Sequence, residues 1–130
     1  MQLWVKIDTG MHRLGFSTDD GPAIISELKT NPKVKDHIEV MTQLANADDL
    51  QHQLNSVQIK AFQALNNPGA SLCNSAALLN FSEVQSDWLR IGLLLYGVSP
   101  IAGLDAASLG FKPVMTFSAP AVKRRIISPL

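Results

Sequence analysis

The first run of the chain has the two-residue period of a β-strand. Leu3, Val5 and Ile7 fall on one face of this segment, and Trp4, Lys6 and Asp8 fall on the other. The alternation ends at Thr9-Gly10, and a glycine-containing loop with Arg13 follows. In α/β folds ligands bind beyond the carboxyl ends of the strands, so this loop is a candidate ligand site.

Helical and strand periods then alternate along the chain. One helix is predicted after the capping residues 17–20, with Pro22 in its first turn, a second over residues 53–65, and a third from Ser75. Strands are predicted over residues 37–44, 70–73 and 87–90. The expected core-facing residues are Ile24, Ile25 and Leu28 in the first helix and Leu54, Val57, Ala61, Phe62 and Leu65 in the second. The order β-α-β-α-β-α-β implies parallel strands joined by right-handed crossovers.

Beyond Pro100 the pattern changes. A loop-like stretch is followed by residues 112–127, which are rich in β-forming residues but contain Pro113 and Pro120, so we expect an edge strand or a broken one. The basic run at residues 123–125 has no interleaved aromatic residues and is read as a solvated surface.

Composition narrows the class of protein. The 130 residues carry 11 Lys plus Arg and 11 Asp plus Glu, a balance that argues against a nucleic-acid partner. The single cysteine, Cys73, cannot form an internal disulfide, and no cysteine cluster indicates zinc. The longest apolar stretch, around Leu93, is too short to span a membrane. We therefore expect a soluble, cytoplasmic protein with a packed core.

Several segments resemble one enzyme family. Residues 6–15 read Lys-Ile-Asp-Thr-Gly-Met-His-Arg-Leu-Gly, which resembles the Lys-x-Asp-Thr-Gly-Met-x-Arg-Leu-Gly segment of bacterial alanine racemases, pyridoxal-phosphate enzymes of fold type III. Residues 41–48, 74–76, 90–100 and 112–116 resemble later segments of the same family, in the same order. The resemblance covers most of the chain.

The resemblance implies an α/β fold, a partial (β/α)8 TIM-type barrel with the start of a C-terminal β-domain. Residues 1–111 would form the C-terminal half of the racemase barrel, which binds pyridoxal 5′-phosphate. Residues 112–130 would form the first strand or tail of the β-domain. A complete barrel needs about 250 residues, so this chain can supply only about half of one.

The resemblance also implies roles for individual residues. Lys6 matches a lysine that is often carbamylated in the family, and Arg13 matches the arginine that this carbamate orients toward the cofactor and the substrate carboxylate. A carbamate is an anion that can fix a guanidinium fork, so the pairing is chemically reasonable. The residues alone favour a surface lysine and a loop cation, and only the match to the family motif reverses that preference.

The remaining residues implied by the resemblance bind the cofactor. Asn74, Ser75 and the backbone N–H groups of Gly92 and Leu93 match its phosphate site, and an Asn-Ser pair is otherwise an ordinary helix cap. Arg90 matches the arginine that faces the pyridine nitrogen; its alternative is a strand-end arginine paired with Asp87 or Glu83.

The chain departs from the family at Gln43, where a histidine near the cofactor ring is usual. Glutamine can donate or accept a hydrogen bond but cannot become charged, so Arg90 is expected to be oriented differently.

The resemblance implies a homodimeric isomerase that interconverts L- and D-alanine, through a Schiff base on the cofactor, and supplies D-alanine for peptidoglycan. The family's Schiff-base lysine and catalytic tyrosine lie in regions that this chain does not match, so we expect the chain alone to be inactive. Two alternatives remain open: a non-catalytic pyridoxal-phosphate-binding barrel module, and an assembly fragment without a ligand.

Overall fold

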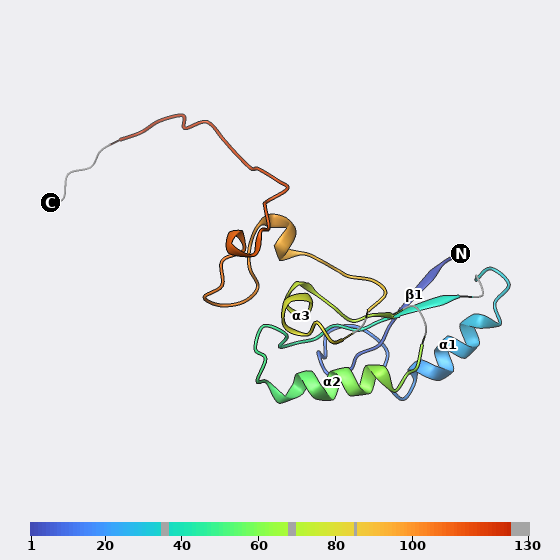
Figure 1. Cartoon of the computed structure of the whole chain (residues 1–130). Coiled ribbons are helices and arrows are strands. Elements are labelled where there is room, and N and C mark those ends of the chain that lie inside the picture. Colours follow the sequence, from blue (N-terminus) through green and yellow to red (C-terminus); the bar gives the residue numbers. More distant parts are fainter. Residues whose placement is uncertain (35–36, 68–69, 85, 126–130) are drawn as a thin grey trace.

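The chain folds around a small parallel sheet. The computed structural model describes residues 1–34, 37–67, 70–84 and 86–125. Its strands are β1 (Leu3–Lys6), β2 (Ile38–Met41) and β3 (Ala70–Ser71), in the order β1-β2-β3 (Figure 1). Lys6 pairs with Met41, which in turn pairs with Ser71, so the carboxyl ends of all three strands meet at one edge of the sheet.

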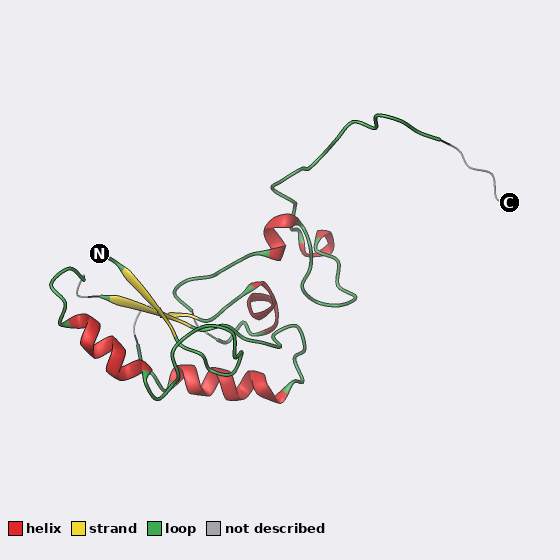
Figure 2. Cartoon of the chain, turned by 180° about the vertical axis from the view of Figure 1, so that it is seen from behind, coloured by secondary structure: helices red, strands yellow, loops and turns green. Residues whose placement is uncertain are grey.

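Within the described residues, three α-helices connect and follow the strands. They are α1 (Gly21–Lys29), α2 (Gln53–Gln63) and α3 (Ser75–Asn80), and two 3-10 turns follow at Leu93–Tyr96 and Ala107–Leu109. The helices begin where the sequence predicts, with Pro22 in the first turn of α1. Helices α1 and α2 lie along the same side of the sheet (Figure 2), as expected of parallel strands joined by helical crossovers.

The core lies between the sheet and these two helices. Val5 and Ile7 of the first strand segment are buried together with Val40, and Ile25 of α1 and Phe62 of α2 pack in the same cluster. The alternation predicted for residues 3–8 is therefore confirmed. On the opposite face of the sheet Trp4 contacts Trp88 edge to face, with ring centroids 5.6 Å apart.

The buried face of α2 agrees with the prediction at Phe62, and just beyond the helix at Leu65, but differs from it at Val57. Val57, expected in the core, is 56% exposed, whereas Asn55 and Gln58 are buried beside Phe62. Two amides take interior positions on this helix: Asn55 donates to backbone carbonyls although its Oδ1 has no partner among the described residues, and Gln58 both donates and accepts. A polar side chain can replace an apolar one in a core when its groups are paired.

The fourth strand predicted over residues 87–90 does not form. Only an isolated parallel bridge between Asn74 and Arg90 is present in that part of the described chain. Side chains take the place of backbone partners: Ala70 N donates to the carboxylate of Asp87 at 2.8 Å, and Leu72 N donates to the hydroxyl of Ser86 at 3.0 Å. The expected ladder is therefore interrupted, but Arg90 still lies at the sheet edge.

The C-terminal stretch contains no strand within residues 112–125, and the end of the predicted strand lies outside the described residues. The tail extends away from the body of the chain (Figure 1), and Phe117 is 94% exposed. Pro113 and Pro120 lack the N–H that a ladder needs, which fits a broken strand. Within the described residues, no helix combines the length and the apolar character that crossing a membrane requires.

Gly15 allows the loop after β1 to fold back onto the strand. Phe16 N donates to Lys6 O at 2.9 Å, and Asp8 N donates to Phe16 O at 2.7 Å. Gly15 has a φ of +129°, and a Cβ there would lie 2.8 Å from Asp8 N and 3.0 Å from Lys6 O. Both neighbours are backbone atoms of the strand end and cannot move aside, so only glycine fits.

We expect Gly15→Ala to lower the free energy of unfolding by about 3 kcal/mol, since it combines a left-handed φ with a backbone clash. The matched control is Gly103→Ala, which has a φ of +75° but nothing within 4 Å of the added Cβ, and which should cost about 1 kcal/mol. Urea unfolding of both variants measures the difference. Equal losses would show that the close approach at Gly15 does not matter.

Candidate functional site

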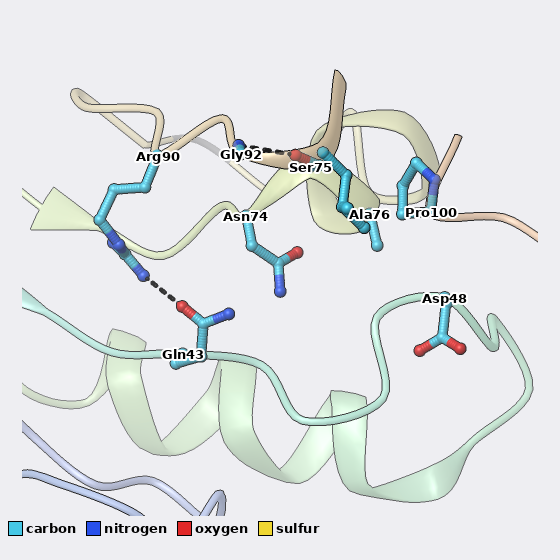
Figure 3. Close-up of a pocket in the computed structure, with 9 residues that line it drawn as sticks. Gln43, Asp48, Asn74, Ser75, Ala76, Arg90, Gly92 and Pro100 are labelled. Atoms are coloured by element: carbon cyan, nitrogen blue, oxygen red, sulfur yellow. Dashed lines mark hydrogen bonds between the residues drawn. The ribbon is translucent and has the colours of Figure 1, made fainter. Parts of the chain in front are cut away.

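A cavity of about 450 Å³ lies at the carboxyl edge of the sheet. Its lining residues are Gln43, Asp48, Asn74, Ser75, Ala76, Arg90, Gly92, Leu93 and Pro100 (Figure 3). All six residues that the resemblance implies for cofactor binding are thus brought together, from three separate segments of the chain. The volume is within the range of small-molecule sites.

Arg90 is held at the cavity by oxygen atoms from two neighbouring strands. Its Nη1 donates to Ser71 O at 2.8 Å and to the Ser71 hydroxyl, and its Nη2 donates to Thr42 O and, at 3.0 Å, to Gln43 Oε1 (Figure 3). These four acceptors are neutral. The guanidinium is therefore fixed in place without any cancellation of its charge.

The alternative partners for Arg90, Asp87 and Glu83, do not pair with it. The ion pairs among the described residues are His12–Asp8 and His37–Glu39 only, and the Asp87 carboxylate is bonded to Ala70 N. Desolvation by burial lowers the pKa of Arg90 from its ordinary value, and the nearby Cys73 sulfur acts in the other direction. A guanidinium is nonetheless fully protonated at neutral pH, so Arg90 presents a permanent positive charge to the cavity.

Ser75 and Gly92 meet on the other side of the cavity. Gly92 N donates to Ser75 Oγ at 3.0 Å, and Ser75 is buried at the first position of α3 (Figure 3). A hydroxyl that accepts one bond keeps its own proton to donate, so Ser75 can direct an O–H at a ligand oxygen.

Asn74 is the N-cap of α3. Its Oδ1 accepts from Ala77 N at 2.9 Å, and its Nδ2 donates to Leu44 O at 3.4 Å. The ordinary capping role considered for the Asn-Ser pair therefore applies to Asn74, although its side chain also lines the cavity.

Lys6 and Arg13 do not line this cavity. Arg13 is exposed on the loop after β1, and Lys6 is half-buried at the carboxyl end of that strand. The pKa of Lys6 is lowered by burial and then by the nearby charges of Arg13 and Arg90, while Asp8 raises it. The three cations thus share one region of positive potential, which disfavours a fourth cation and favours anions.

Asp8 organises the loop that carries Arg13. One carboxylate oxygen accepts from three successive backbone N–H groups, those of Gly10, Met11 and His12, at 2.9–3.0 Å. The hydrogen bond from Gly10 lowers the pKa of Asp8 most, against a smaller opposing effect of burial. His12 has a φ of +55°, a conformation that histidine tolerates better than branched residues do.

Three residues that support the site are missing from the sequence-based prediction: Thr42, Ser71 and Gln58. Nothing local marks the first two, because their roles depend on Arg90, which is distant in the sequence. Gln58 has a detectable signal: it is spaced four residues from both Leu54 and Phe62, which places an amide on a core-facing stripe. Asp48, Ala76 and Pro100 also line the cavity without a predicted role.

The described residues contain no group of three or more His, Cys, Asp or Glu side chains that could hold a metal ion.

Comparison with known sequences gives one consistent result. The family model described as "Alanine racemase, N-terminal domain" matches residues 1–100. The alanine racemase of Legionella pneumophila (strain Lens) is 43% identical over 120 residues, which cover 90% of this chain and 34% of the relative. That of Coxiella burnetii (strain RSA 493 / Nine Mile phase I) is 39% identical over 136 residues, covering 96% and 37%. The chain spans about a third of the length of these relatives.

Solved structures agree. The biosynthetic alanine racemase of Pseudomonas aeruginosa superposes with a TM-score of 0.80 at 40% identity, over 87% of this chain and 32% of that protein. The alanine racemase of Acinetobacter baumannii gives a TM-score of 0.73 at 33% identity, over 87% and 34%.

The loop after β1 should be stabilised by the ionised form of Asp8. Because its pKa is lower in the folded chain than the ordinary 3.8, its stabilisation is present above that value and is lost as the pH falls through the folded pKa. We expect Asp8→Asn to cost about 1–2 kcal/mol at about pH 7, with the cost shrinking toward about pH 3. Urea unfolding across this range measures it.

Asp19→Asn is the matched control, since Asp19 is exposed and lies before α1. It should change stability by less than about 0.5 kcal/mol throughout. A pH-independent cost of Asp8→Asn would contradict a role for the carboxylate charge.

Proposed function

Because the chain belongs to the alanine racemase family, we propose that it forms the cofactor-holding part of an enzyme that interconverts L- and D-alanine using pyridoxal 5′-phosphate. One observation carries the proposal: Arg90, Ser75 and Gly92 converge on a single cavity at the carboxyl ends of parallel strands. Such edges are the usual ligand sites of α/β folds.

The residues present fit this cofactor at both of its ends. Ser75 has an O–H to donate to a phosphate oxygen while it accepts from Gly92 N, and the amides at the start of α3 lack partners within the helix. Arg90 lines the same cavity with an uncancelled charge, suited to the ring nitrogen. When bound, the cofactor supplies an electron sink that stabilises negative charge on the substrate α-carbon.

Arg90 would limit the strength of that sink. It donates hydrogen bonds and cannot release its proton at neutral pH, so a ring nitrogen beside it stays an acceptor. A carboxylate in the same place would favour a protonated, more electron-withdrawing ring. Gln43 supports this arrangement, because its Oε1 holds the guanidinium and stays neutral at any pH.

Lys6 is proposed to carry a carbamate. A lowered pKa leaves more of the amine neutral, and the neutral nitrogen can attack the carbon of CO₂, forming an N–C bond and releasing one proton to solvent. The positive surroundings that penalise an ammonium would stabilise the resulting anion. The carbamate would then hold the Arg13 guanidinium toward the substrate carboxylate.

The rest of the enzyme is also a matter of proposal. We take the three strands as consecutive strands of a (β/α)8 barrel, with residues 1–111 in the barrel and 112–130 leading into a β-domain. The groups that move protons to and from the substrate would come from segments outside this chain, in a cytoplasmic homodimer that supplies D-alanine for peptidoglycan. The chain alone would bind the cofactor without racemising alanine.

The test of cofactor binding is a titration with pyridoxine 5′-phosphate, whose alcohol cannot react with lysine amines as an aldehyde does. We expect saturable binding by the wild-type chain, weakened about tenfold by Ser75→Ala and by Arg90→Ala, since each removes a bond to a charged or polar group of the ligand. Calorimetry measures the affinities.

The control is Ser56→Ala on α2, whose hydroxyl bonds Gln53 O within its own helix. It should bind as the wild type does. No saturable binding, or binding indifferent to Ser75 and Arg90, would reject the cofactor site and favour an assembly fragment without a ligand.

The carbamate is tested by carbon NMR in ¹³C-bicarbonate at alkaline pH. We expect one protein-bound carbamate signal in the wild-type chain that is absent in Lys6→Gln and retained in Lys60→Gln, a change at an exposed lysine of α2. A signal that survives in Lys6→Gln would reject Lys6 as the modified residue.

A further inference from the structure

A fully buried amide lies behind the site, on the helix side of the sheet. Gln58, in the middle of α2, is 0% exposed. It belongs neither to the cavity lining nor to the residues that contact Arg90. Burying an amide is costly unless its donors and acceptor are all paired, so its contacts are the informative feature.

Gln58 makes three hydrogen bonds, each to the carboxyl end of a strand segment. Its Oε1 accepts from Ala45 N at 2.9 Å, and its Nε2 donates to Gln43 O at 3.0 Å and to Thr9 Oγ1 at 3.3 Å. The Thr9 hydroxyl in turn lies 2.8 Å from the Thr42 hydroxyl. One side chain therefore ties the segment after β2 to the segment after β1.

The two tied segments carry or hold the cations of the site. Gln43 and Thr42 are the acceptors that fix Arg90 Nη2. Thr9 begins the loop that carries Arg13, and the Asp8 carboxylate makes the first residues of that loop a fixed turn. A shift of Thr9 relative to Gln43 would change the separation of the two arginines.

We propose that Gln58 is a positioning residue that sets the placement of Arg90 and of the Arg13 loop relative to each other. Only an amide of this length can accept from one backbone N–H and donate to both a carbonyl and a hydroxyl. The part of the inference that concerns ligand binding rests on the proposed function. The part that concerns the arginines does not.

The first experiment uses the ligand-free chain. The guanidinium N–H signals of Arg90 and the amide exchange of residues 10–13 are recorded by NMR in Gln58→Met, which keeps the length but removes the polar groups. We expect the Arg90 signals to shift and amide exchange in the loop to rise about tenfold, corresponding to a loss of about 1.4 kcal/mol of local protection.

The matched control is Phe62→Leu, one turn further along α2 and also buried. It should lower the melting temperature but leave the Arg90 signals in place. Thr9→Val is a milder variant that removes the Thr9 bonds to Gln58 and to the Thr42 hydroxyl but keeps the bonds of Gln58 to Gln43 and Ala45, so it should raise exchange at residues 10–13 and shift the Arg90 signals less than Gln58→Met does. Equal Arg90 shifts in Phe62→Leu and Gln58→Met, or none in Gln58→Met, would overturn the proposal.

The second experiment compares two probes. Pyridoxine 5′-phosphate would contact both Arg90 and the Ser75 side of the cavity, whereas inorganic phosphate would use only the Ser75 side. Gln58→Met should weaken the first about tenfold and the second by less than twofold. Equal losses of affinity for the two probes would overturn the positioning role of Gln58. If the wild-type chain binds neither probe, the proposed function has failed, and the ligand-free Arg90 signals still decide the inference about Gln58.

Discussion

The site depends on one charged group that is held only by neutral oxygens. Arg90 reaches from the segment after β3 to carbonyl and side-chain oxygens of Thr42, Gln43 and Ser71, so it joins the ends of two strands to its own segment. A carboxylate partner would have held the side chain equally well but would have neutralised its charge. No carboxylate pairs with Arg90 among the described residues. The same side chain therefore connects the strand ends and gives the cavity its positive potential.

Other polar groups fix the backbone around this arginine. The Asp8 carboxylate orders the loop after β1, Ser75 orients Gly92, and Gln58 joins the strand ends from behind. Each of these groups bonds at least one backbone atom, so the position of the main chain around the site depends on them. This arrangement explains why the cavity is lined by residues from four segments although the sheet has three short strands in the part of the chain that the structure describes.

The sequence predicted the parts of the fold that depend on local periodicity. The alternation in residues 3–8 and the start of each helix could be inferred from periodicity and capping residues, whereas the grouping of Arg90, Ser75 and Gly92 was implied only by the family resemblance. The missing strand at residues 87–90 could not, because the side chains of Ser86 and Asp87 occupy the amides that a ladder would have used. Hydrophobic spacing placed Phe62 of α2 correctly but not Val57, and it gives no sign of an amide such as Gln58 that is buried through its hydrogen bonds.

The contact between Trp4 and Trp88 has a consequence of its own. These are the only two tryptophans of the chain, and they join the first strand to the segment that follows the last one. Their rings lie 5.6 Å apart at 80°, close enough for the electronic transitions of the two indoles to couple. The near-ultraviolet circular dichroism of the chain therefore originates largely in this tryptophan pair, and it reports whether β1 and the segment after β3 are correctly packed together.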